Sequence, residues 1–252
     1  MKSLLRKVIL VLRAIIVFCD WHVWLGDRFG FLMKHGQFRF RDGTKFFFSP
    51  IQGDQIGYFQ EIYLQKIYTK NYKPRERERE GNGGVVLDLG ANIGVFSIFI
   101  ASLDPRFKVY SYEPAPRVFR RLVKNISANN LSERIHHFRY AVASKNAHEI
   151  SLTEGGNDML DDIEFKAPAI TIEKIFEDNH INRCAFLKMD IEGMEFEVLP
   201  ATPQEIWKRI DYVAMEYHDD PSSLKAILSK QGFTVESFHT TNTCGIIYAD
   251  RK

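Results

Sequence analysis

From residue 85 to the end of the chain, short apolar runs alternate with segments in which apolar residues recur every three or four positions. The runs have the length and composition of buried strands, and the segments between them have the period of amphipathic helices. We expect strands at 85–89, 108–112, 135–141, 185–190, 212–217, 233–238 and 245–249, and helices at 95–103, 116–129, 170–179, 193–199 and 222–231. Apolar strands separated by helices predict a parallel sheet that is covered on both faces.

The last two predicted strands break this alternation. The segments 233–238 and 245–249 are joined by a turn-rich stretch, 239–244, with no helix between them. Two strands joined this closely form an antiparallel hairpin. The predicted fold is therefore α/β and doubly wound, with a mostly parallel seven-stranded sheet that a C-terminal antiparallel hairpin closes.

The N-terminal third has a different pattern and is predicted to be an appendage of helix, hairpin and helix. Residues 4–18 are strongly apolar, residues 37–41 and 45–48 flank an Asp42-Gly43 turn, and 54–72 has helical spacing before Pro74. A charged and then glycine-rich stretch, 75–84, follows as a linker. We divide the chain into an amphipathic helix (1–25), an appendage with hairpin, helix and linker (26–80) and the main domain (81–252).

The first helix admits two interpretations. Lys2, Arg6, Arg13 and Asp20 would line one narrow face, while the uninterrupted apolar stretch 14–18 is too short to cross a bilayer. No small-residue cleavage site follows, which disfavours a signal peptide. The helix either lies in a membrane interface, with Trp21 and Trp24 at headgroup depth, or packs on its own domain or on a partner chain.

Charge and cysteine usage narrow the class of protein. A net charge of +2 over 252 residues lacks the basic surface expected of a nucleic-acid-binding protein. Cys19, Cys184 and Cys244 are odd in number and widely spaced, which predicts neither disulfides nor zinc and favours a reducing compartment. We therefore expect a cytoplasmic protein, at the inner face of the membrane if the first helix is interfacial. The oligomeric state is not predicted.

The turn between the first strand and helix of the main domain carries the clearest chemical signal. Gly90 and Gly94 would let the chain turn tightly against a ligand, but Asn92 and Val95 break the glycine pattern of dinucleotide-binding proteins. Asp88 would repel a pyrophosphate and suits a cationic ligand better. Glu113, at the end of the second strand, can accept hydrogen bonds from both hydroxyls of a ribose. These residues predict a pocket for a cationic ligand that carries a ribose.

These residues resemble the class I S-adenosylmethionine-dependent methyltransferases and, more narrowly, the FkbM family. The resembling pieces include Asp88 to Gly94, Glu113-Pro114, Tyr140-Ala141-Val142 and the run from Leu187 to Glu195, followed by Met215 to His218. The resemblance covers about residues 39–248 and implies a Rossmann-like methyltransferase sheet. It assigns the cofactor to Asp88, Gly90, Asn92, Gly94, Glu113, Ala141 and Asp190.

Four side chains are predicted to meet at one rim of the sheet and to carry the chemistry: Asp190, Glu192, Glu216 and His218. Ligands of parallel α/β sheets bind beyond the carboxyl ends of the strands, where these residues lie. Methyl transfer to a hydroxyl needs an acceptor for the proton, and Asp190 or His218 is the expected base. As an alternative, the four residues could hold a divalent metal such as Mg²⁺.

The predicted function is O-methylation of a hydroxyl on a glycan, glycolipid precursor or related small molecule, a substrate class that the resemblance implies. Two alternatives remain at this point. An N-methyltransferase acting on an amine would use the same cofactor turn, and a non-catalytic membrane-associated binding protein would keep the fold.

Overall fold

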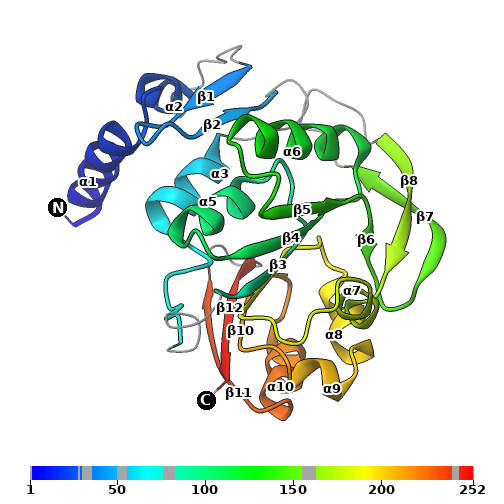
Figure 1. Cartoon of the computed structure of the whole chain (residues 1–252). Helices are drawn as coiled ribbons and strands as arrows, with labels where there is room; N and C mark the ends of the chain where they lie inside the picture. The colour runs from blue at the N-terminus through cyan, green and yellow to red at the C-terminus, as the bar shows by residue number, and fades with distance from the viewer. Residues whose placement is uncertain are drawn as a thin grey trace.

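The computed structural model describes residues 2–27, 29, 36–49, 56–75, 83–154, 163–239 and 244–251. Its centre is a seven-stranded sheet with the strand order β11-β12-β10-β9-β3-β4-β5 (Figure 1). The strands are β3 (Val85–Leu89), β4 (Lys108–Tyr112), β5 (Ile135–Phe138), β9 (Phe186–Met189), β10 (Tyr212–His218), β11 (Phe233–His239) and β12 (Cys244–Arg251). Strand β12 pairs antiparallel with both β10 and β11, and the other pairs are parallel. The predicted sheet and its C-terminal hairpin are confirmed.

Helices cover the sheet on both faces, as Figure 1 shows. On one face lie α5 (Val95–Leu103) and α6 (Pro116–Ala128), and on the other α7 (Ile172–Asp178), α8 (Glu195–Ala201), α9 (Gln204–Trp207) and α10 (Ser222–Lys230). Because successive strand residues point to opposite faces, Val86 joins the core beneath α5 whereas Leu87 joins the second core. The expected helices are present, and α9 is an addition that the sequence did not predict.

The chain after β5 departs from the expected single strand over 135–141. Strand β5 ends at Phe138, and β6 (Ala141–Val142) belongs to a separate sheet with β8 (Ile163–Ile170) and β7 (Ala147–Glu154). Strand β8 pairs with both of the others, parallel to β6 and antiparallel to β7. This small sheet was not predicted.

The N-terminal appendage begins with α1 (Lys2–Val17) and α2 (Trp21–Asp27), followed by a hairpin of β1 (Gln37–Arg39) and β2 (Lys45–Phe47). The expected helix over 54–72 is shorter. It comprises α3 (Gly57–Phe59) and a π-helical segment, η2 (Gln60–Gln65), which ends where Lys66 adopts a left-handed conformation at φ 56°. Residues 54 and 55 lie outside the described chain, as does most of the expected linker. The boundaries proposed at residues 25 and 80 stay predictions.

Aromatic side chains attach the appendage to the main domain. The Phe38 and Phe59 rings stack at 4.6 Å, and Tyr63 packs against Phe99 of α5 at 4.9 Å. Trp24 is buried in the same cluster, with its ring 6.3 Å from that of Phe18. A buried Trp24 cannot lie at headgroup depth, so that part of the interfacial interpretation is wrong. In the part of the chain that the structure describes, no helix has the length and apolarity to cross a bilayer.

Candidate active site

The turn after β3 is held against the ends of two neighbouring strands. Gly90, Asn92 and Gly94 all have positive φ angles, of 78°, 50° and 89°. A Cβ atom at Gly90 would stand 1.7 Å from the carbonyl oxygen of Asp190, so only glycine fits where this turn meets the end of β9. The backbone N–H groups of Gly90 and Ala91 both donate to the Tyr112 carbonyl of β4.

Glu113 supports the same turn from the end of β4. Its two carboxylate oxygens accept hydrogen bonds from the backbone N–H groups of Asn92 and Ala115, each at 2.9 Å. The side chain is nearly buried, and this pairing fixes its orientation beside the turn. A carboxylate oxygen can accept more than one hydrogen bond, so Glu113 keeps the capacity to bind a ribose hydroxyl.

Asp88 faces the protein interior. It is fully buried, accepts a hydrogen bond from the Ser97 hydroxyl and lies 3.3 Å from the ammonium group of Lys188. Lys188 also donates to the Gly90 carbonyl at 2.6 Å and approaches Asp190 at 3.6 Å. The buried ammonium group therefore ties Asp88, the turn and Asp190 together.

A hollow opens between this turn and the appendage. Its lining in the described chain includes Gly90, Ala91 and Asn92 of the turn and the side chains of Lys188, Asp190 and Glu216. Residues of the appendage and α5 complete it: Tyr58, Glu61, Ile62, Tyr68, Val95 and Phe96. Of the residues predicted for the cofactor and the chemistry, the structure thus brings Gly90, Asn92, Asp190 and Glu216 to one hollow. The roles of these residues stay predictions.

The remaining predicted residues are not part of the lining of this hollow in the described chain. Gly94 precedes α5, and Ala141 is buried at the start of β6. Glu192 is 86% exposed, with a carboxylate oxygen 3.8 Å from Nε2 of His218. Nδ1 of His218 is buried and makes no hydrogen bond within the described part of the chain.

The sequence did not predict the roles of Tyr68, Glu61 or Lys188. The Tyr68 hydroxyl bridges the two acids of the hollow, at 3.0 Å from Asp190 and 3.2 Å from Glu216. Lys188 could have been found, because it precedes Asp190 by two positions and alternate strand residues point the same way. Tyr68 and Glu61 could not, because only the docking of the appendage brings them there.

The acids of the hollow share an unfavourable charge environment. Burial, together with the charge of Asp190, raises the pKa of Glu216 to about 7 and also raises the pKa of Glu61. Burial alone would lower the pKa of Lys188, but the charges of Asp88 and Asp190 outweigh it and the pKa is raised. The lysine therefore stays charged, and Glu216 can hold a proton near neutral pH.

This arrangement does not favour the divalent-metal alternative. Among the described residues, no three His, Cys, Asp or Glu side chains are grouped so that they could hold a metal ion. Lys188 already provides Asp190 with a positive partner, and the Glu192 side chain is largely exposed. The metal alternative is therefore not carried further.

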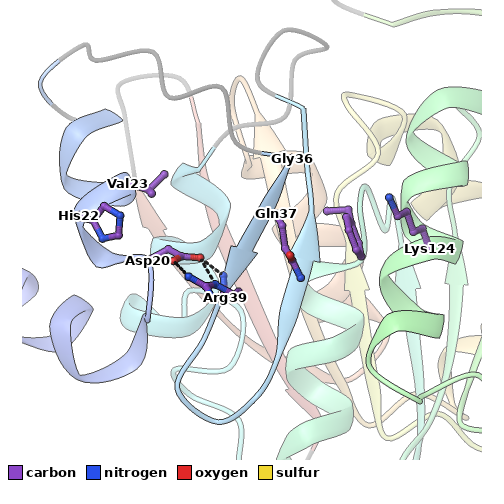
Figure 2. A pocket seen from close by; sticks show the side chains of 8 residues that line it. Asp20, His22, Val23, Gly36, Gln37, Arg39 and Lys124 are labelled. Carbon is purple, nitrogen blue, oxygen red and sulfur yellow. Dashed lines mark hydrogen bonds and ion pairs between the residues drawn. The ribbon is translucent and has the colours of Figure 1, made fainter.

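A second hollow lies away from this chemistry. Figure 2 shows it between α2, the β1–β2 hairpin and α6, with Asp20 and Arg39 paired on one side and Lys124 on the other. Its charged groups have partners in the protein: Asp20 binds Arg39 at 2.8 Å, and the Lys124 ammonium lies 3.6 Å from the centre of the Phe47 ring. This hollow contains none of the predicted site residues, so the hollow at the turn is kept as the candidate site.

The main domain of this chain is similar to known proteins. Residues 88–235 match the family model described as "Methyltransferase FkbM domain". The chain is 24% identical to methyltransferase sdnD of Sordaria araneosa over 230 residues, which cover 73% of this chain and 88% of that protein. It is 25% identical to the 31-O-demethyl-FK506 methyltransferase FkbM of Streptomyces tacrolimicus, over 70% of this chain and 81% of that one. A third relative, the hexuronic acid methyltransferase AglP of Haloferax volcanii, is 24% identical over 60% of this chain and 64% of its own length.

Proposed function

Because the chain belongs to the FkbM methyltransferase family and is an S-adenosylmethionine-dependent methyltransferase, we propose that it methylates a hydroxyl on a glycan, a glycolipid precursor or a related small molecule. The observation that carries this proposal is the hollow in which Asp190 and Glu216 meet the glycine turn. Two relatives support it, since one is named for a 31-O-demethyl substrate and another for a hexuronic acid. The expected alternative of a non-catalytic protein is wrong.

The residues of the turn suit this cofactor. Gly90 lets the turn pack against the Asp190 carbonyl, where a side chain would not fit, and Glu113 presents a fixed carboxylate beside Asn92. S-adenosylmethionine supplies an electrophilic methyl group and a ribose with two neighbouring hydroxyls. We propose that Gly90, Asn92 and Gly94 form the cradle and that Glu113 binds the ribose. Asp88 would act indirectly, through Lys188, and Ala141 would contribute apolar surface.

The acids of the hollow provide the proton acceptor that the transfer requires. As the new C–O bond forms and the S–C bond breaks, the hydroxyl proton must leave the acceptor oxygen. We propose that Asp190 or His218 takes this proton and that Glu216 and Glu192 orient the acceptor. Tyr68 would hold Asp190 and Glu216 at a constant separation, since its hydroxyl contacts both.

The acidic lining also keeps the amine alternative open. Carboxylates attract an ammonium group as readily as they accept hydrogen bonds from sugar hydroxyls. A panel of sugar and amine acceptors with labelled cofactor distinguishes the two functions, because transfer of label to the amine alone would contradict O-methylation.

We further propose a cytoplasmic location and a peripheral contact of residues 1–24, through side chains other than the buried Trp24, with the inner face of a membrane. The widely spaced cysteines support a reducing compartment. Such a contact would bring the enzyme to a membrane-bound glycolipid precursor.

Calorimetry with S-adenosylhomocysteine tests the cofactor site. We expect Glu113→Gln to weaken binding by about tenfold or more, because a charged hydrogen bond to the ribose is lost. Glu133→Gln changes an exposed acid elsewhere and serves as the matched control. Equal affinities for the two variants would contradict the proposed ribose site.

Turnover measurements test the proton acceptor. Loss of the base should reduce kcat by about 10²–10⁴-fold and leave cofactor affinity nearly unchanged. Asp190→Asn and His218→Ala are the two variants, with His148→Ala at an exposed position as the control. If neither variant slows methyl transfer, the proposed base is wrong.

A further inference from the structure

Helix α1 carries two apolar faces that point in opposite directions. Ala14 and Phe18 are completely buried, and Leu10 and Val17 pack beside them against the core of the appendage. At 100° per residue these positions form one side of the helix. This inner face explains how α1 is held on the protein.

The other apolar face remains uncovered. It consists of Leu5, Val8, Ile9, Leu12 and Ile16, which we call the outer stripe; their side chains are 60%, 47%, 42%, 53% and 70% exposed. Their spacing of three or four residues places them in a continuous line. Single exposed leucines are common, but a continuous line of aliphatic residues marks an interaction surface.

Charge identifies the kind of surface that fits the outer stripe. The sequence places Lys2, Arg6, Lys7 and Arg13 in α1 and has no acidic residue before Asp20. Asp20 is already bound to Arg39. A second copy of the chain would bring two positively charged helices together, whereas an anionic lipid surface offers opposite charge and an apolar layer beneath it.

We infer that the outer stripe inserts into the interface of an anionic lipid bilayer, with the helix lying along the surface. This assigns a defined face to the peripheral contact proposed above, and it does not depend on methyl transfer. Helix α1 lies at the edge of the molecule in Figure 1 and packs against η2, where Arg13 reaches the Leu64 carbonyl. Because η2 also contributes Glu61 to the hollow, a bound α1 would hold that hollow close to the lipid surface.

Flotation with the full-length protein tests the inference without cofactor or acceptor. Vesicles of phosphatidylcholine with phosphatidylglycerol are compared with vesicles of phosphatidylcholine alone, at low and high salt. The double variant Leu12→Glu/Ile16→Glu changes only exposed positions, so the fold should be retained, which circular dichroism and thermal unfolding verify. Leu103→Glu, at a half-exposed leucine at the end of α5, is the matched control.

We expect the wild type and Leu103→Glu to float with anionic vesicles, less so at high salt, because screening weakens the electrostatic part. The double variant should bind at least about tenfold more weakly. Failure of the wild type to float, or equal flotation of the double variant, would overturn the inference. The inference would also be overturned if light scattering showed that the wild type is a dimer without lipid and that the double variant is a monomer. A second copy of the chain would then be the partner that covers the outer stripe.

Discussion

At the scale of single residues, two glycines with similar backbone angles are expected to tolerate substitution very differently. Gly90 and Gly193 have φ angles of 78° and 92°, but only Gly90 lies against another backbone atom. Gly193→Ala should cost about 1–2 kcal/mol in the free energy of unfolding, from conformational strain alone. Gly90→Ala should cost more than about 3 kcal/mol, because the turn must move away from Asp190.

Urea unfolding of the two variants measures this difference. Since both substitutions add the same methyl group at a positive φ angle, strain is common to both and the contact at Asp190 is the variable. If the free energy of unfolding fell by a similar amount in the two variants, the turn could move away from β9 without loss of stability.

Glu216 predicts a pH dependence of stability. The folded protein holds a proton on Glu216 up to about pH 7, whereas the unfolded chain releases it near the ordinary value of 4.5. Between these values the folded state binds more protons, so the free energy of unfolding should fall as pH rises. Asp190, Lys188 and Glu61 line the same hollow, and the charge of His218 also acts on Glu216, so these groups contribute to the absolute profile.

Glu216→Gln should flatten this part of the profile, because the variant stays neutral throughout. Urea midpoints between about pH 4.5 and pH 7.5 provide the measurement, with Glu133→Gln as the exposed control. A slope that is the same in all three proteins would show that Glu216 does not titrate differently on folding.

At the scale of elements, two asparagines, Asn125 of α6 and Asn129 at the C-terminal cap of that helix, extend the hydrogen bonding of the β1–β2 hairpin. Asn125 exchanges hydrogen bonds with the backbone N–H and C=O of Phe47, and Asn129 does the same with Lys45. Residues four apart on a helix thereby match residues two apart on a strand edge. Asn125 also donates to the Ile93 carbonyl at 2.8 Å, which links the hairpin to the cofactor turn.

Asn125→Ala should therefore destabilise the protein and loosen the hairpin together. Removing the buried amide leaves the Ile93 carbonyl and the Phe47 backbone groups without these partners, at a cost of about 3 kcal/mol. Hydrogen exchange at the Phe47 amide and urea unfolding measure the two effects. Asn71→Ala, at an exposed site in the same appendage, should change neither; an unchanged exchange rate in Asn125→Ala would contradict this account.

The elements also show what a sequence can and cannot predict. Strands β3 and β4 match the predicted bounds because central parallel strands are apolar on both faces and stand out in the sequence. Strands β7 and β8 were missed because much of their surface is exposed, which leaves little apolar contrast. The π-helical form of η2 was also missed, since one turn of either helix has nearly the same apolar spacing.

The same distinction applies to the candidate site, because only part of it can be predicted from local sequence. The turn and Asp190 follow from local sequence, because the carboxyl ends of parallel strands meet at one edge of the sheet. The contacts of Tyr68 with Asp190 and Glu216 join residues 122 and 148 positions apart. No local pattern predicts such contacts, since they depend on how the appendage packs on α5.

At the scale of the whole molecule, the appendage and the main domain share one hydrophobic core. Tyr63 and Tyr68 of the appendage contact Phe99 and Phe96 of α5, and Tyr72 contacts Phe186 of β9. A fragment of residues 81–252 lacks the three tyrosines and would expose Phe96, Phe99 and Phe186 to water. We expect it to aggregate or to unfold without a cooperative transition, as light scattering and thermal circular dichroism can show. A monomeric fragment with a sharp transition would mean that the main domain folds independently.

The asparagine contacts between α6 and the hairpin also bear on how the protein is made. The ribosome releases the hairpin first, and its partners Asn125 and Asn129 emerge 78 and 84 residues later. Until then, the hairpin cannot pack against α6. The hairpin segment carries four phenylalanines: Phe38, Phe40, Phe46 and Phe48. The nascent chain therefore presents an aromatic segment that chaperones can bind, and the appendage completes its folding only after the helix that receives it has been synthesised.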